Sequence, residues 1–177
     1  MRKEYKKAIS RAFEANVKRL VFPFVLVRPK SSMIVPGEDV YEWIGKNANF
    51  FITVVPQRSG MNAFGLEGGW SVYRRFPAIN FRPSTHIDET AGVTLLPECT
   101  FLLSEVWGDS SALWLIKELP SSLDEITREQ LKIDPAQAAE DVRPFVESAI
   151  DMIIKHVIPF YRLIDERLGS IVIENEH

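Results

Sequence analysis

The fold is decided by residues 49–73, which read NFFITVVPQRSGMNAFGLEGGWSVY. The first part, residues 49–57, is rich in β-branched and aromatic residues with little polar alternation, which indicates a strand buried on both faces. Residues 58–60, RSG, have the composition of a turn. We therefore expect residues 49–57 and 61–73 to form an antiparallel hairpin.

The second strand of this hairpin has two unlike faces. Side chains alternate between the faces of a strand, so bulky apolar residues fall on one side and small or polar residues on the other. The two sets are Phe64, Leu66, Trp70 and Val72 against Ala63, Gly65, Glu67, Gly69 and Ser71. The first set is expected to lie in the core. The pair Gly68-Gly69 also suggests a β-bulge.

Glu67 stands among glycines on the polar face of this strand. Because glycine leaves room for a close approach, a carboxylate here is a candidate for the floor of a shallow groove. Two plainer interpretations stay open. Glu67 is either one half of an ion pair, for which Arg74 or Arg75 is the nearest partner in sequence, or a solvated residue on the outer face.

The segments before and after the hairpin extend the pattern. Residues 3–20 have the 3.6-residue period of an amphipathic helix, with Phe13 and Val17 in its apolar stripe and lysines and arginines opposite. Further strands are expected at 21–28, 40–46, 100–107 and 112–119. Only four residues separate the last two, so they are expected to form a second hairpin.

The last third of the chain reads as helical. Ser122 and Glu125 have the spacing of a capping box, which predicts a short helix to about residue 132. Asp134 followed by Pro135 marks the start of a longer helix.

The apolar stripe of that longer helix passes two prolines, Pro144 and Pro159, which are expected to break or kink it, and stops at Gly169. The chain is thus one helix, a run of strands, and then helices. This order predicts a single α+β domain over residues 1–177, with an antiparallel sheet of about five or six strands flanked by an N-terminal helix and C-terminal helices.

Composition and charge narrow the class of protein. A chain of 177 residues can bury a sizeable core without a metal or a disulfide, and its one cysteine, Cys99, has no intramolecular partner. The longest apolar run, residues 21–27, is too short to span a membrane, so a cytoplasmic location is expected. The aromatic residues of the basic first helix, Tyr5 and Phe13, fall in its apolar stripe rather than among its lysines and arginines, so nucleic-acid binding is not expected.

Familiar catalytic motifs are missing from the sequence. There is no phosphate-binding glycine loop, no paired-cysteine motif and no nucleophile elbow. His86, Asp88 and Glu89 are the best local cluster, but no second histidine or cysteine has ligand spacing, so we expect neither a metal site nor a cofactor. Cys99 and His156 are expected to be structural, and the four tryptophans are expected in strands, as core rather than as a ligand platform.

The order of several short motifs resembles that of small uncharacterised bacterial α+β domain families, some of which are suspected of roles as immunity or antitoxin partners. The motifs are Tyr41-Glu-Trp43, Phe50-Phe51-Ile52, Phe64-Gly-Leu-Glu67-Gly-Gly-Trp70-Ser71, Arg75-Phe76-Pro77 and Ile158-Pro159-Phe160. The resemblance implies a fold, not a reaction. It carries no catalytic residue.

These observations favour a binding or protein-interaction domain, with an immunity or antitoxin role as one form of it. The alternative is a small hydrolase or a small-ligand-binding protein that uses a cleft near Glu67 and the loop at 74–97. A loop of that length is more often functional than average. The candidate binding residues are Glu67, Arg74, Arg75, His86 and Asp88.

Overall fold

The structure is a computed structural model that describes residues 3–18, 20, 24–31, 34–35, 37–57, 62–78, 96–108, 113–117 and 133–174, with only the backbone of 117 and 171–174. Its elements in chain order are α1 (Lys3–Val17), β1 (Val25–Val27), β2 (Asp39–Ile44), β3 (Asn49–Pro56), β4 (Asn62–Ser71), β5 (Glu98–Leu102), α2 (Ser104–Trp107), β6 (Leu113–Lys117), α3 (Pro135–Met152), a π-helical segment (Ile153–Val157) and α4 (Ile158–Glu174). The predicted α+β architecture is confirmed.

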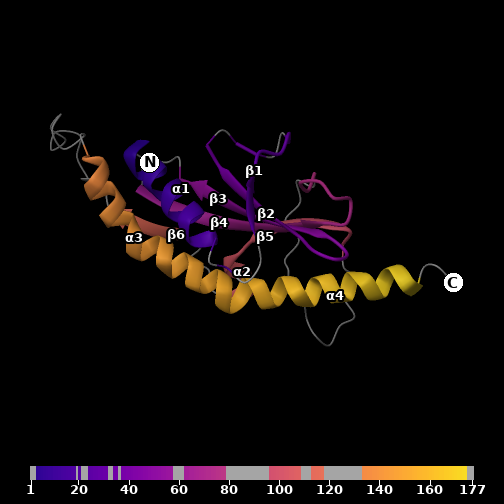
Figure 1. The fold of residues 1–177 in the computed structure, drawn as a ribbon. Coiled ribbons are helices and arrows are strands. Elements are labelled where there is room, and N and C mark those ends of the chain that lie inside the picture. The colour runs from indigo at the N-terminus through magenta and orange to yellow at the C-terminus, as the bar shows by residue number, and fades with distance from the viewer. Residues whose placement is uncertain are drawn as a thin grey trace.

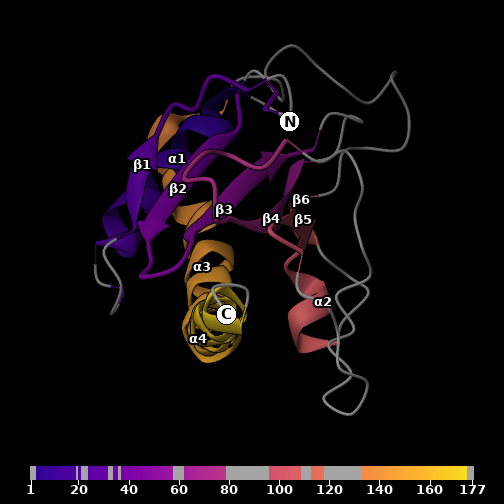
Figure 2. The ribbon, with the colours of Figure 1, turned by 90° about the vertical axis from the view of Figure 1, so that its right-hand side faces the viewer.

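The sheet lies on one side of the molecule and the helices on the other (Figures 1 and 2). Strands β1 to β4 follow one another in space, and each neighbouring pair is antiparallel. The expected hairpin is confirmed, because β3 pairs with β4 in continuous register from Asn49 opposite Ser71 to Pro56 opposite Phe64. The long hairpin forms the centre of the sheet.

The predicted second hairpin is wrong. Both β5 and β6 pair with β4, β5 along residues 67–71 and β6 along residues 62–65. The ten residues of β4 are long enough to hold two five-residue strands end to end on the same edge. Helix α2 interrupts this edge between them, and it contains Trp107, which was expected in a strand.

The expected bulge at Gly68-Gly69 is also wrong, because the register of β4 runs unbroken through both residues against β3 and β5. Gly68 faces the helices instead. A Cβ on Gly68 would lie 2.7 Å from the hydroxyl oxygen of Tyr161 and 2.5 Å from Cδ2 of Leu103. The missing side chain makes room for a helix residue.

Helix α1 confirms the amphipathic stripe but ends at Val17 rather than at residue 20. Its buried residues are Tyr5, Ala8, Ile9, Phe13 and Val17. The Phe13 ring lies 6.0 Å from the rings of both Tyr41 and Phe64, on the inner face of the sheet. The helix therefore packs on the sheet through the predicted side.

The C-terminal helices form one bent rod under the sheet (Figure 1). Helix α3 begins directly after Asp134, as predicted, and Pro144 lies within it without breaking it. The π-helical segment ends just before Pro159, where the missing N–H disturbs the regular bonding pattern. Gly169 does not end the helix. A Cβ there would lie 2.6 Å from Nδ2 of Asn47, so Gly169 allows α4 to approach the sheet.

The core fills the space between the inner face of the sheet and these helices. It includes the predicted face of β4, with Phe64, Leu66 and Trp70 all buried. No helix in the described part of the chain is both long enough and apolar enough to cross a membrane. The short helix predicted at residues 122–132 lies outside the described residues.

Candidate functional site

The turn between β2 and β3, residues 45–48, is held from the helix side by Asp165 of α4. One oxygen of the Asp165 carboxylate accepts a hydrogen bond from the backbone N–H of Lys46 at 2.8 Å. The other oxygen accepts from the N–H groups of Asn47 at 2.7 Å and Ala48 at 3.2 Å. A single carboxylate thus ties the long helix to one end of the sheet.

Arg74 holds the same turn from the β4 side. Its guanidinium donates to the carbonyl oxygens of Gly45 at 2.9 Å and Lys46 at 2.8 Å, and to Oδ1 of Asn49 at 2.9 Å. Its φ angle of 56° lies in the left-handed region, which a residue with a side chain adopts at a cost. Two hydrogen bonds to the turn and one to the first residue of β3 offset this backbone strain.

Tyr161 of α4 joins the two central strands from below. Its hydroxyl donates to the carbonyl oxygen of Phe51 at 2.6 Å and accepts from the N–H of Gly69 at 3.1 Å. Burial raises the pKa of Tyr161 well above its ordinary range, so the hydroxyl stays protonated. The position of the hydroxyl requires the bare backbone of Gly68 beside it.

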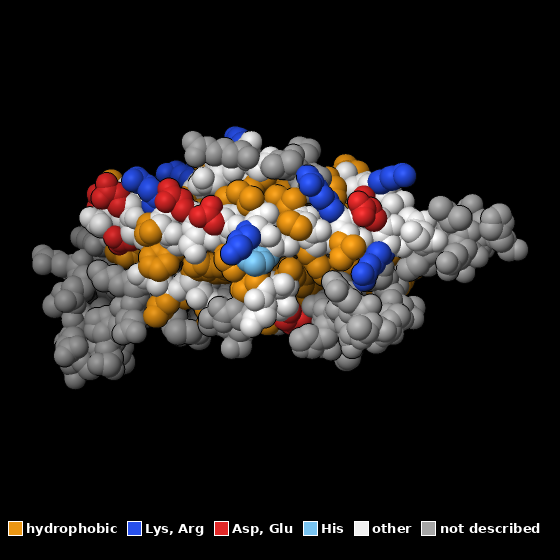
Figure 3. All heavy atoms as spheres, turned by 90° about the horizontal axis from the view of Figure 1, so that it is seen from below, with side chains coloured by type: hydrophobic (Ala, Val, Ile, Leu, Met, Phe, Trp, Pro, Cys, Tyr) orange, Lys and Arg blue, Asp and Glu red, His pale blue; other side chains and the backbone are white. Residues whose placement is uncertain are grey.

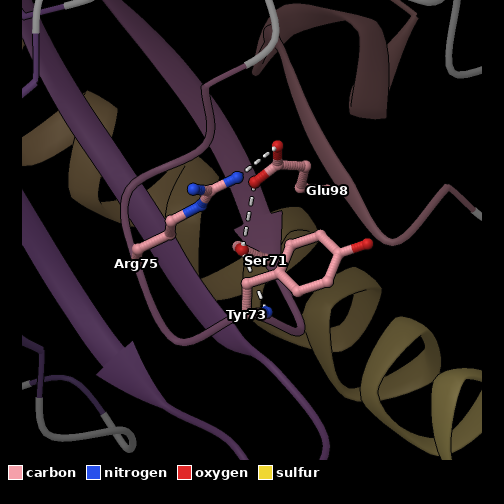
Figure 4. Close-up of polar contacts among 4 residues, drawn as sticks. All are labelled: Ser71, Tyr73, Arg75 and Glu98. Atoms are coloured by element: carbon pink, nitrogen blue, oxygen red, sulfur yellow. Dashed lines mark hydrogen bonds and ion pairs between the residues drawn. The ribbon is translucent and has the colours of Figure 1, made fainter.

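The outer face of the sheet, which points away from the helices, carries a polar network at the end of β4. The buried carboxylate of Glu98 pairs with Nη2 of Arg75 at 3.3 Å and accepts a hydrogen bond from Oγ of Ser71 at 3.3 Å. The same Ser71 oxygen accepts the N–H of Tyr73 at 3.2 Å. Figure 4 shows Arg75 and Ser71 converging on Glu98.

A groove of about 540 Å³ lies next to this network on the outer face. Its floor includes Glu42 of β2 and Phe51 of β3. One wall is residues 27–31, from the last residue of β1 onward, and the other is formed by the segment 74–78 after β4, through residues 74–76 and 78. The wall meets the floor where the Phe76 ring packs edge-on against Phe51 at 5.3 Å. The groove is therefore built by segments that follow two strands on either side of β2 and β3.

The groove is rich in positive charge. Its lining contains four cationic residues, Arg28, Lys30, Arg74 and Arg75, and one carboxylate, Glu42. Two of the arginines have carboxylate partners outside the lining: Arg28 with Asp39 at 3.5 Å, and Arg75 with Glu98. Arg74 bonds only neutral oxygens among the described residues, and Lys30 is exposed.

Exposed apolar side chains lie beside the groove. Val25 stands directly opposite Glu42 in the sheet, and Ile44 is the next residue of β2 on the same face. Tyr73 precedes the wall at 74–78. All three side chains are more than half exposed. The rim of the groove thus combines apolar contact area with cations.

The structure brings together only part of the predicted site. Arg74 and Arg75 both line the groove, whereas Glu67 is half-buried opposite Thr53 and Leu102 and is not among the lining residues. The described bonds of the two arginines go to the turn and to Glu98, not to Glu67. His86, Asp88 and Glu89 lie outside the described residues, so predictions about them stay predictions.

Sequence reasoning missed Arg28 and Lys30, which follow the edge strand β1 and face the arginines of the other wall. The only signal is a basic pair around Pro29, with Arg28 as the last residue of the predicted strand 21–28 and Lys30 just after it. The sequence does not tell which segments after the strands fold over the same face of the sheet.

Two other residues, expected to be structural from the sequence, lie away from the groove lining. Cys99 is buried, and burial, with a smaller contribution from the charge of Glu105, raises the pKa of its thiol to about 12. The ring of His156 lies 6.2 Å from the ring of Trp107. No group of three histidine, cysteine, aspartate or glutamate residues in the described segments is placed to hold a metal ion.

Comparison of the chain with protein-family models, with curated proteins and with solved structures found no match.

Proposed function

We propose that the chain is a binding domain that recognises a partner protein through the outer face of its sheet, with the groove at the centre of the contact. The observation that carries this proposal is the combination of four cationic residues in the groove with exposed Val25, Ile44 and Tyr73 at its rim. Exposed apolar and aromatic side chains beside arginines offer a partner protein both apolar contact area and charged groups.

The kinds of residue at the groove support a protein partner. Arginine and aromatic residues are enriched where proteins bind one another, and they carry a large share of the binding energy. The groove and its rim contain three arginines and the aromatic residues Phe51, Tyr73 and Phe76. The underlying sheet is rigid, because Asp165 and Arg74 hold its turn and Tyr161 links its central strands.

A hydrolase is less well supported by the same residues. General acid–base catalysis needs at least two titratable groups that converge on a substrate. Glu42 is the one carboxylate among the described lining residues, and it accepts a hydrogen bond from Nδ2 of Asn49 at 2.6 Å. A small anionic ligand has one observation in its favour, since about 540 Å³ is an ordinary size for a ligand pocket.

The helix side of the molecule provides the matched control for an experiment. Its described surface mixes apolar side chains with charges of both signs (Figure 3). Ile154 and Lys155 are both exposed there. Ile154→Asp and Lys155→Glu therefore repeat, on the opposite side, the chemistry of Ile44→Asp and Lys30→Glu at the groove.

The test is affinity capture of partners from the cells that make this chain, with the wild type and these four variants as baits. We expect a protein that the wild type and both helix variants retain and that both groove variants lose. Loss of the same protein from the helix variants, with retention by the groove variants, would reject the groove as the binding site. Competition by free citrate or glutamate at micromolar concentration would favour the small-ligand alternative.

A further inference from the structure

We infer that the partner presents an extended acidic segment to the groove, that Arg75 and Lys30 each bind one of its carboxylates, and that Glu98 positions Arg75 for this contact. The inference rests on the proposed function and specifies the chemistry of the partner. It follows from a difference between the two cations on opposite walls: Arg75 is held by an ion pair with Glu98, whereas Lys30 is exposed.

Arg75 is exposed but held in one place. Its side chain is 59% exposed, while the Glu98 side chain that pairs with it is only 8% exposed. Glu98 is itself fixed by the hydroxyl of Ser71, and the Arg75 guanidinium lies 5.4 Å above the ring of Tyr73. A guanidinium has five N–H donors, and among the described residues only the Nη2 group of Arg75 has a partner.

This arrangement suits recognition of a carboxylate. The open edge of a fixed guanidinium can donate two parallel hydrogen bonds to one carboxylate, and little side-chain freedom is lost because the side chain is already ordered. Because Glu98 neutralises part of the charge of Arg75, anions that cannot form these two hydrogen bonds are attracted only weakly. The pair therefore selects a ligand by hydrogen-bond geometry more than by net charge.

Lys30 on the other wall supplies the second contact. It is exposed and lies across the floor of Glu42 and Phe51 from the wall that contains Arg75. Adjacent side chains of an extended chain point in opposite directions. A segment that runs between the walls thus sends neighbouring acidic residues to opposite walls, while Phe51 and Phe76 contact its backbone and apolar atoms.

Two explanations of the basic groove predict opposite effects of Glu98→Gln. If net positive charge alone attracts the partner, removing a carboxylate strengthens binding. If Glu98 positions Arg75, the variant weakens binding although it adds a net positive charge. Arg75→Lys separates the same two explanations, because lysine keeps the charge and lacks the planar fork.

The experiment measures fluorescence anisotropy of a labelled ten-residue peptide with four consecutive Glu and Asp residues between leucines, and of its Gln/Asn counterpart. Thermal melts check that each variant is folded. We expect the wild type to bind the acidic peptide only, with affinity that falls with salt. Arg75→Lys, Lys30→Ala and Glu98→Gln should each weaken binding about five- to tenfold, the value of one hydrogen bond of ordinary net strength, and Lys155→Ala should not.

Each failure has its own meaning. Equal or tighter binding by folded Glu98→Gln would overturn the positioning role of Glu98. Capture of a partner through the groove, without binding of the acidic peptide, would overturn the acidic segment and leave the proposed function standing. If the groove captures no partner and the acidic peptide does not bind, the proposed function and the inference are both rejected.

Discussion

Gly68→Ala should destabilise the protein because the added methyl group has no space. Its Cβ would lie 2.5 Å from Cδ2 of Leu103, 2.7 Å from Cζ of Phe101 and 2.7 Å from the hydroxyl oxygen of Tyr161. The leucine methyl is the end of a flexible side chain and can move. The tyrosine hydroxyl cannot, because it is bonded to the backbones of both β3 and β4.

The size of the effect follows from these contacts. Forcing an extra methyl group into a packed core costs about 1–3 kcal/mol. Tyr161→Phe removes the hydroxyl and leaves the carbonyl of Phe51 and the N–H of Gly69 without this buried partner, which costs about 1–3 kcal/mol. The double variant removes one of the three atoms that the new methyl group meets. Its loss of stability should therefore be smaller than the sum of the single losses by about 1 kcal/mol.

Urea unfolding followed by tryptophan fluorescence provides the four free energies of this cycle. Tyr73→Phe, at an exposed tyrosine, should stay within about 0.5 kcal/mol of the wild type and serves as the control. Additive losses in the double variant would refute the reasoning, because they would mean that the Gly68 backbone and the Tyr161 hydroxyl do not compete for the same space.

Three further predictions concern other parts of the fold. Phe13→Ala should cost about 3–5 kcal/mol in urea unfolding and Lys7→Ala less than about 0.5 kcal/mol; equal midpoints would show that the α1 stripe is misassigned. Arg74→Ala should be less stable than Arg74→Gly by about 1 kcal/mol, because both lose the bonds to the turn but only glycine relieves the positive φ; the reverse order would contradict the strain. Burial raises the pKa of Cys99 from 9.0 to about 12, which favours the neutral thiol in the folded state. The stability that the neutral thiol contributes is therefore complete below about pH 9 and is lost as the pH rises toward 12. The free energy of unfolding of the wild type should thus fall more steeply above about pH 9 than that of Cys99→Ala. Parallel pH profiles would argue against a buried thiol.

The parts of the fold that depend on local pattern were predictable from the sequence. The stripe through Phe13 and the hairpin at 49–73 each combine a clear period with a recognisable boundary, so element type and inward face follow directly. The pairing of β5 and β6 does not depend on local pattern. A short connection between two strands is compatible with a hairpin and also with two pieces of one edge, and only the length of β4 decides between them.

The glycines show the same limit. Gly68 has the local signature of a bulge and Gly169 that of a helix end, yet each is required by a residue far away in sequence, Tyr161 and Asn47 respectively. The candidate site likewise depends on residues that are far apart in the sequence. Arg74 and Arg75 are next to the decisive hairpin in the sequence, whereas the opposite wall of the groove is visible only in the structure, where the segments after β1 and after β4 both line the groove over Glu42 and Phe51.

The measurement that tests the central claim most directly is amide hydrogen exchange of the chain with and without its captured partner. Binding at the groove predicts slower exchange in the two walls, residues 27–31 and 74–78, and unchanged exchange in the π-helical segment Ile153–Val157 on the opposite side. Protection confined to the helices, with both walls exchanging as in the free protein, would contradict the account.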